Sequence, residues 1–189
     1  MKPDKNKLQE WAREIHATAT RHGWHEERMP GGHWLAMIMT EVAEAIEADR
    51  IGRHADETTF RRLLYAGEGG KVADSWFFSL YGTTIKGTVE EELADIAIRI
   101  LDASNEIHGE KQTWTGYDSG MSPRPSALFT EAAFCFVKDV LNSGTMNLAY
   151  SMDYMFGWAG QLGIDLGWHI EQKMKYNTLR EYKHGGKRY

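Results

Sequence analysis

Apolar side chains recur at intervals of three and four residues through most of this 189-residue sequence. That spacing places them on one face of an α-helix, which is typical of helices packed against a common core. The pattern therefore predicts an all-α fold. The predicted helices lie at about residues 4–21, 33–51, from 88 onward, 126–142, 147–162 and 167–183.

Local signals mark several helix ends. Gly23 follows the first predicted helix and can supply the left-handed turn that ends one. Thr88 is a good N-cap residue, and Glu91 three residues later completes a capping box. These signals fix the start of the helix that carries the second acidic motif described below.

Residues 52–87 form the least regular part of the pattern. They carry many aromatic and aliphatic side chains, which must be buried against something. We expect one or two short helices there, separated by the glycine-rich residues 67–70. They would form an insertion that acts as a lid or as a subunit contact.

Length and composition fit one domain over residues 1–189, since 42% hydrophobic and 26% charged residues are ordinary for a soluble globular protein. The N-terminus lacks the apolar segment of a signal peptide, and no apolar run approaches the roughly 20 residues that cross a bilayer. We therefore expect a cytoplasmic protein with no membrane partner. Cys135, the single cysteine, is expected to be a small buried hydrophobe.

Charge is distributed unevenly along the chain. Residues 171–189 hold six Lys or Arg against two acids, whereas the net charge of the whole chain is −5. An acidic body with a basic end suits a metal–polyphosphate ligand held between them. Nucleic-acid binding is not expected as the primary function, because basic residues are few elsewhere.

Two acidic motifs carry the candidate chemistry. Glu41 and Glu44 lie three residues apart on the second predicted helix, and Glu92 and Asp95 do so on the third, so each pair shares a helix face. Both pairs lie in apolar sequence, where four carboxylates need a cation. Mg²⁺, or alternatively Mn²⁺, is the expected ion, because both motifs lack the thiols and imidazoles that softer metals prefer.

The same pattern allows other roles for these carboxylates. On a helical wheel Glu44 falls nearly opposite the apolar stripe, so it could simply face water unless the third helix or another subunit covers it. Arg99, one turn beyond Asp95, could form an ion pair with it in place of a metal. Asp102, two turns beyond Asp95, could instead extend the acidic site.

The order of the motifs, ExxE from Glu41, ExxD from Glu92 and KxxxNxxR from Lys173, resembles the all-α nucleoside triphosphate pyrophosphatase superfamily, the MazG-like proteins. The resemblance implies a bundle of four to six helices, assembled as a homodimer or homotetramer. It also implies hydrolysis of a nucleoside triphosphate to the monophosphate and pyrophosphate, in the control of nucleotide pools. Candidate catalytic residues are Glu41 and Glu44, and the implied Mg²⁺ ligands are Glu41, Glu44, Glu92 and Asp95.

Two further segments complete the expected substrate site. Lys173, Asn177 and Arg180 share one face of the last predicted helix, and the resemblance implies that they contact phosphates. Trp24, followed by Pro30, resembles a loop of the dCTP-pyrophosphatase branch and could stack on a nucleobase. A buried core tryptophan is the alternative.

Other functions remain compatible with the sequence. They are a pyrimidine-specific dCTP or dUTP pyrophosphatase of the same superfamily, and a catalytically silent helical interaction module. A phosphoribosyl-ATP pyrophosphatase fits less well because of the insertion and the Trp24 loop, and the tetrad of a di-iron bundle is absent. His16 and His33 are further candidates for a base pocket, and residues 184–189 form a basic tail that could order over the ligand.

Overall fold

The structure is a computed structural model that describes residues 3–66, 72–114 and 127–186. Within these ranges every regular element is a helix, which confirms the predicted all-α class. The elements are α1 (Lys5–Arg21), α2 (Gly31–Arg50), α3 (Glu57–Tyr65), α4 (Asp74–Thr84), α5 (Val89–His108), η2 (Gly109–Lys111), α6 (Phe129–Ser143), η4 (Gly144–Asn147), α7 (Leu148–Gln161), α8 (Leu166–Thr178) and α9 (Lys183–Gly186).

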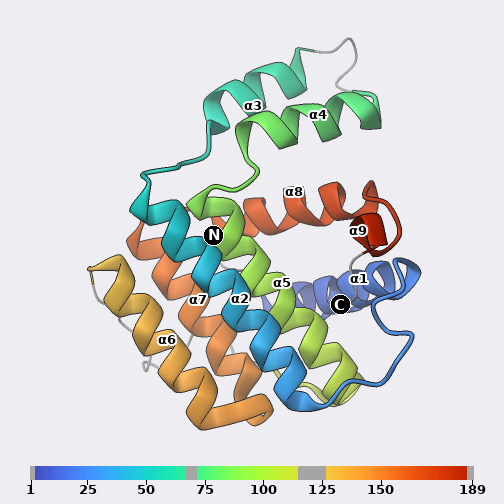
Figure 1. Cartoon of the computed structure of the whole chain (residues 1–189), viewed down its shortest axis with the longest axis vertical. Coiled ribbons are helices and arrows are strands. Elements are labelled where there is room, and N and C mark those ends of the chain that lie inside the picture. The colour runs from blue at the N-terminus through green and yellow to red at the C-terminus, as the bar shows by residue number, and fades with distance from the viewer. Residues whose placement is uncertain (1–2, 67–71, 115–126, 187–189) are drawn as a thin grey trace.

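Helix α5 is central, because α1, α2, α7 and α8 all pack against it (Figure 1). Most side chains of α5 are buried, whereas α1 buries only one stripe. The buried positions of α5 include Glu90, Glu91, Glu92 and Asp102. A buried carboxylate is costly unless it is paired or protonated, so each of these four positions needs a donor, a cation or a proton.

Several predicted helix ends are confirmed. The Asp4 side chain caps α1, His22 is the C-cap of that helix, and Gly23 adopts a φ of +83°. Thr88 caps α5, where its hydroxyl oxygen accepts a hydrogen bond from the Glu91 backbone N–H. Helices α6 and α7 also lie close to their predicted positions.

Helix α8 is shorter than predicted. It ends at Thr178 rather than near residue 183. The backbone N–H groups of Leu179 and Arg180 bond to carbonyls only three residues back, at 3.1 and 3.3 Å, so the last turn tightens and the helix stops. Arg180 therefore lies beyond the helix on which the sequence placed it.

The insertion forms two helices, α3 and α4, as the sequence predicts. They pack against each other, and α4 also contacts α8. Residues 67–71, which connect them, lie outside the described ranges. A lid or subunit contact stays a prediction for this pair. Its hydrophobic cluster is separate from the main core and consists of Phe60, Phe77, Leu80, Tyr81, Ile85 and, from α8, Tyr176.

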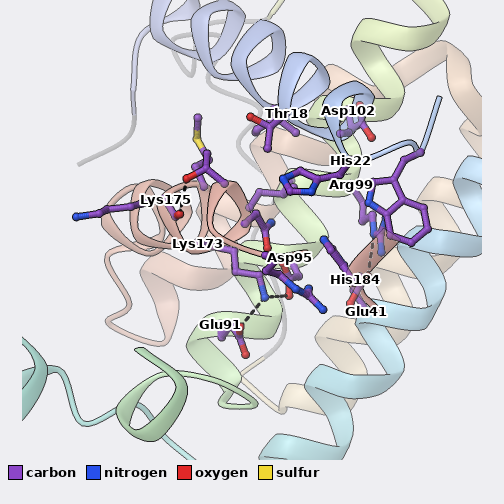
Figure 2. A pocket seen from close by; sticks show the side chains of 18 of the residues that line it. Thr18, His22, Glu41, Glu91, Asp95, Arg99, Asp102, Lys173, Lys175 and His184 are labelled. Carbon is purple, nitrogen blue, oxygen red and sulfur yellow. Dashed lines mark hydrogen bonds and ion pairs between the residues drawn. The ribbon is translucent and has the colours of Figure 1, made fainter. Parts of the chain in front are cut away.

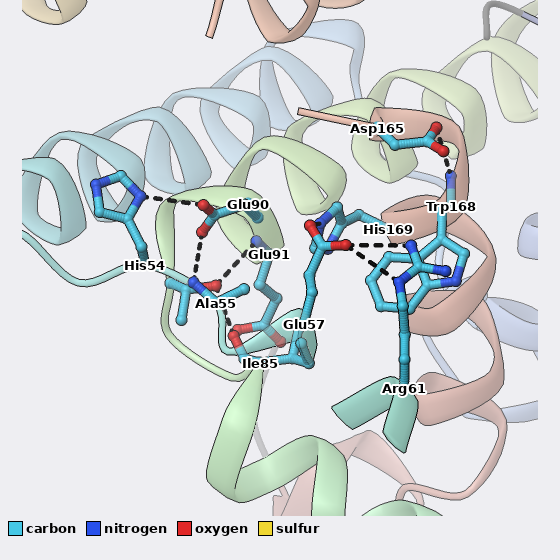
Figure 3. A network of polar contacts seen from close by, with 11 residues as sticks. His54, Ala55, Glu57, Arg61, Ile85, Glu90, Glu91, Asp165, Trp168 and His169 are labelled. Atoms are coloured by element: carbon cyan, nitrogen blue, oxygen red, sulfur yellow. Dashed lines mark hydrogen bonds and ion pairs between the residues drawn. The ribbon is translucent and has the colours of Figure 1, made fainter. Parts of the chain in front are cut away.

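Polar contacts tie the start of this insertion to the bundle (Figure 3). Glu90 on α5 accepts a hydrogen bond from the Ala55 N–H at 2.8 Å, and its other oxygen lies 3.0 Å from His54 Nδ1. Glu57 on α3 lies 2.9 Å from Nε2 of the buried His169 on α8. The insertion is thus anchored to α5 and to α8 by charged groups as well as by aromatic rings.

Apolar side chains fill the main core, but a few of them are only partly buried or are exposed. Cys135 packs against the core, as expected, although it is only partly buried. Helix α6 leaves Phe134 and Leu141 exposed. Among the described residues, no helix combines the length and the apolarity that crossing a bilayer requires.

Replacement of a fully buried ring in the insertion tests whether this cluster stabilises the fold. Phe60→Ala should lower the free energy of unfolding by about 3–5 kcal/mol, because it removes apolar contacts and leaves a cavity. Urea unfolding followed by circular dichroism measures this. Tyr65→Ala on the same helix is the control, since that ring is 66% exposed and should change the free energy by less than about 0.5 kcal/mol. If the two variants lowered the free energy of unfolding equally, the cluster would not be what stabilises the fold.

Candidate functional site

A pocket of about 840 Å³ lies among α1, α2, α5 and α8 (Figure 2). Both acidic motifs line it, as do the segment around Trp24 and the end of the chain at His184. The pocket therefore gathers residues that lie far apart in the sequence. Its charged lining includes Glu41, Glu44, Glu91, Glu92, Asp95, Asp102, Lys86, Arg99, Lys173, Lys175 and Arg180.

Three of the four predicted metal ligands come together in this pocket. Glu41, Glu44 and Glu92 each offer a carboxylate oxygen, and these oxygens all lie within 4.8 Å of one another. Helix α5 packs against α2 and provides the second layer that the sequence required. Glu44 is nevertheless exposed, as its wheel position predicted, while Glu41 and Glu92 are buried.

Asp95 has a different partner from the other three. Its Oδ2 lies 2.6 Å from Nζ of Lys173, and the same ammonium donates to Glu91 Oε1 at 2.5 Å. Burial opposes the charge on Lys173, but Asp95 and Glu91 outweigh it and raise its pKa above the ordinary value. Asp95 therefore stands beside the group of three and is held by a buried cation.

Arg99 also binds a carboxylate other than the expected one. Its Nε donates to Glu41 Oε1 at 2.8 Å, so the predicted Arg99–Asp95 ion pair is not the one that forms. The reason is geometric, because Lys173 approaches Asp95 from α8 whereas Arg99 faces α2. Arg99 thus holds the buried Glu41 carboxylate in position.

Glu92 is the least satisfied member of the cluster. Its Oε2 is buried and has no hydrogen-bond partner among the described residues. Burial, together with the nearby Asp95 and Glu91, raises the pKa of Glu92 to about 9. Burial and Asp95 likewise raise the pKa of Glu41, although Arg99 opposes the shift. Lys173 and Arg99 therefore do not offset all of these carboxylates, and Glu92 holds a proton near pH 7.

Glu91 is a site residue that the sequence pointed to for another reason. Its carboxylate accepts a hydrogen bond from the Gly87 backbone N–H, and it also binds Lys173. The capping-box pattern with Thr88 was the signal for Glu91 in the sequence. A capping carboxylate reaches back over the start of its helix, and it therefore lies beside any side chain that packs against that helix start. Glu91 both caps α5 and helps to position Lys173.

The three predicted phosphate-binding residues have different environments. Lys173 is 4% exposed and engaged by two carboxylates, so it does not present a free ammonium. Asn177 lines the pocket, and its Oδ1 is buried without a partner among the described residues. Arg180 lines the pocket as well, from the turn after α8.

Trp24 and the described part of the tail form one wall of the pocket. Trp24 is partly exposed, so the buried-core alternative does not hold, and its ring lies edge-on to His184 at 5.1 Å between centroids. The Lys183 N–H donates to the His22 carbonyl at 3.0 Å. Burial, with Arg180 close by, lowers the pKa of His184 to about 3, so its imidazole is neutral at pH 7. Residues 187–189 of the predicted tail lie outside the described ranges.

Asp102 does not extend the acidic cluster. Its Oδ1 lies 3.1 Å from His16 Nδ1 and 2.9 Å from His25 Nε2. Burial favours the neutral acid, but these hydrogen bonds lower the pKa of Asp102 overall, and the bond to Asp102 raises that of His16. The sequence suggested His16 only for a base pocket and not as a partner of Asp102. It missed His25, because a histidine in a loop carries no periodic signal.

No protein-family model, curated protein or solved structure matches the chain. The geometry of the pocket and the spacing of the motifs are therefore the observations that bear on function.

Because folding raises the pKa of Glu92, the stability of the fold depends on pH. Between its ordinary pKa of 4.5 and its folded value of about 9, the folded chain holds one more proton than the unfolded chain, so stability falls as pH rises. Glu92→Gln removes the titrating carboxyl group, and with it this loss of stability at high pH. In a metal-free buffer the variant should unfold at a higher temperature than the wild type at about pH 8, and at nearly the same temperature at about pH 4.

Calorimetry across this pH range provides the measurement. Glu47→Gln, an exposed change on α2, is the control and should follow the wild type. If Glu92→Gln instead unfolded at a lower temperature than the wild type at about pH 8, the ionised Glu92 carboxylate would be stabilised by its surroundings.

Proposed function

We propose that this protein is a Mg²⁺-dependent nucleoside triphosphate pyrophosphohydrolase, which releases a nucleoside monophosphate and pyrophosphate. The observation that carries the proposal is the buried Glu92 carboxylate, which lies against Glu41 and Glu44 and has one oxygen without a hydrogen-bond partner in the described part of the chain. The pocket volume of about 840 Å³ falls within the usual range for small-molecule sites. The order of the acidic and basic motifs, which resembles that of the MazG-like superfamily, supports the same activity.

The residues fit a hard divalent cation. Glu41, Glu44 and Glu92 offer oxygen ligands, and a cation could replace the proton that Glu92 holds near pH 7, since Glu92 Oε2 has no hydrogen-bond partner among the described residues. When bound, Mg²⁺ would neutralise phosphate oxygens and lower the pKa of a coordinated water. Asp95 lies next to this group and could join it only by sharing its carboxylate with Lys173.

Neighbouring side chains have distinct parts in this reaction. Arg99 orients Glu41, and Lys173 orients Asp95 and Glu91, so these carboxylates are held in place before a substrate arrives. Glu44 is exposed to the pocket and is the carboxylate best able to accept a proton from an attacking water.

The basic end of the chain serves the phosphates and the base. Arg180 and Asn177 line the pocket and offer a guanidinium and an amide to phosphate oxygens. Trp24 offers an aromatic face at the pocket wall, where a nucleobase could stack. A homodimer or homotetramer is the assembly that the superfamily resemblance implies.

Glu44→Gln tests the catalytic assignment, because it removes one charge from an exposed position. Pyrophosphate release from a mixture of ribo- and deoxyribonucleoside triphosphates with Mg²⁺ should fall by on the order of 100-fold or more. Glu47→Gln, one turn further along the same helix and also exposed, should keep the wild-type rate. A Glu44→Gln enzyme that releases pyrophosphate at the wild-type rate would remove Glu44 from the mechanism.

Ligand-induced stabilisation tests the site without turnover. The unfolding temperature should rise when Mg²⁺ and a non-hydrolysable triphosphate are added together, and rise much less with either alone, because each completes the site for the other. Arg180→Gln should weaken the joint effect. The absence of any joint effect in the wild type would favour the silent helical module.

A further inference from the structure

A second cluster of ionisable side chains lies apart from Glu41, Glu44 and Glu92. His16 on α1 and His25 in the loop after it both contact Asp102 on α5, and their rings are 4.2 Å apart. The donor atoms of all three residues lie within 4.8 Å of one another. Glu106, one turn beyond Asp102, approaches both rings from another side. Its Oε2 lies 3.8 Å from His16 Nε2 and 3.4 Å from His25 Nδ1.

Each imidazole thus has a carboxylate oxygen near both of its nitrogens. A ring can satisfy both oxygens only if both of its nitrogens carry N–H groups or if a cation lies on one of the nitrogens. The His25 Nδ1 is buried and makes no well-formed hydrogen bond among the described residues, although Glu106 Oε2 lies 3.4 Å away. Its side chain is only 5% exposed, and water cannot readily repair the mismatch.

We propose that His16, His25 and Asp102 form a Zn²⁺ site, a function separate from the proposed hydrolysis. With the metal on His16 Nδ1, His25 Nε2 and Asp102, the remaining N–H of each ring is free to donate to Glu106. A histidine that binds a metal almost always donates its other N–H to a carboxylate or carbonyl in this way. Glu106 would therefore hold both rings in the required tautomer.

The distances suit such an ion. The two nitrogens lie 2.9 and 3.1 Å from Asp102 Oδ1, and neighbouring ligands of a tetrahedral zinc are about 3.3 Å apart, so a small expansion suffices. Two imidazoles and one carboxylate favour Zn²⁺ over Mg²⁺, whereas the all-oxygen group of Glu41, Glu44 and Glu92 favours Mg²⁺. The two sites are thus distinguished by ligand chemistry.

Binding would join three parts of the chain. His16 belongs to α1, Asp102 belongs to α5, and His25 belongs to the loop that also carries Trp24. The His25 ring stacks on Trp34 of α2, with centroids 5.1 Å apart, so the loop already contacts the bundle there. The metal would fix the loop at the pocket wall. Three protein ligands leave the fourth position of a tetrahedral ion to water or to a pocket ligand, because Asp102 also lines the pocket.

Titration of the metal-free full-length chain with Zn²⁺, in competition with a chromogenic chelator, tests the proposal. The wild type should bind one Zn²⁺ with an affinity that excess Mg²⁺ does not change. His16→Gln removes a ligand that is 24% exposed and should weaken this binding by more than about 100-fold. Glu106→Gln leaves all three ligands and should weaken it by about 10- to 100-fold.

Two matched variants separate this site from others. His54→Gln removes an imidazole that is 60% exposed elsewhere, and Glu92→Gln alters the acidic group; both should bind Zn²⁺ as the wild type does. Co²⁺ should give the visible spectrum of a four-coordinate ion in the wild type and lose it in His16→Gln, while the circular dichroism of that variant should match the wild type and so exclude a folding defect.

Three results would overturn the proposal. They are the absence of stoichiometric Zn²⁺ binding in the wild type, wild-type affinity in His16→Gln, and loss of Zn²⁺ binding in Glu92→Gln. The last result would place the Zn²⁺ at the acidic group. None of them affects Mg²⁺-dependent pyrophosphate release, which is measured separately.

Discussion

The crowding of carboxylates at the start of α5 is the constraint on which the rest of the site depends. Glu91, Glu92 and Asp95 lie within two turns of one buried helix, and α2 adds Glu41 and Glu44. Lys173 and Arg99 neutralise part of this charge, and their ion pairs join α8 to α5 and α5 to α2, respectively. The surplus of carboxylates is borne by Glu92, because burial and the nearby Asp95 and Glu91 raise its pKa to about 9 and it therefore holds a proton near pH 7. A fold that buries so many like charges beside an open pocket is more readily explained by a ligand than by stability.

Much of the fold could be predicted from the sequence, because apolar periodicity and capping residues are local signals. Thr88 and Gly23 marked helix ends correctly, and the aromatic content of the insertion, where one or two short helices were expected, correctly indicated that its side chains are buried. The end of α8 was placed too late. The sequence from Asn177 to residue 183 has no Pro or early Gly to stop a helix, and the stop depends on tight bonds in the last turn together with the docking of Lys183 on His22.

The site was predictable in its residue types but not in its pairings. Spacing indicated that Glu41 and Glu92 would meet if two helices packed, and they do. It could not indicate that Lys173 would bind Asp95 or that Arg99 would turn to Glu41, since those contacts depend on where α8 crosses α5. The cluster of His25 with Asp102 was missed for the same reason, because its members come from three separate elements.

Proton release on Mg²⁺ binding reports whether Glu92 and a divalent cation meet in this pocket. Glu92 is protonated near pH 7 in the free protein, and it should become ionised when a divalent cation binds to Glu41, Glu44 and Glu92. Calorimetric titration with Mg²⁺ in buffers of different ionisation heat gives the number of protons released. We expect about one proton per Mg²⁺ near pH 7, and none for Glu92→Gln. Binding with no proton release in the wild type, or no binding at all, would contradict this expectation.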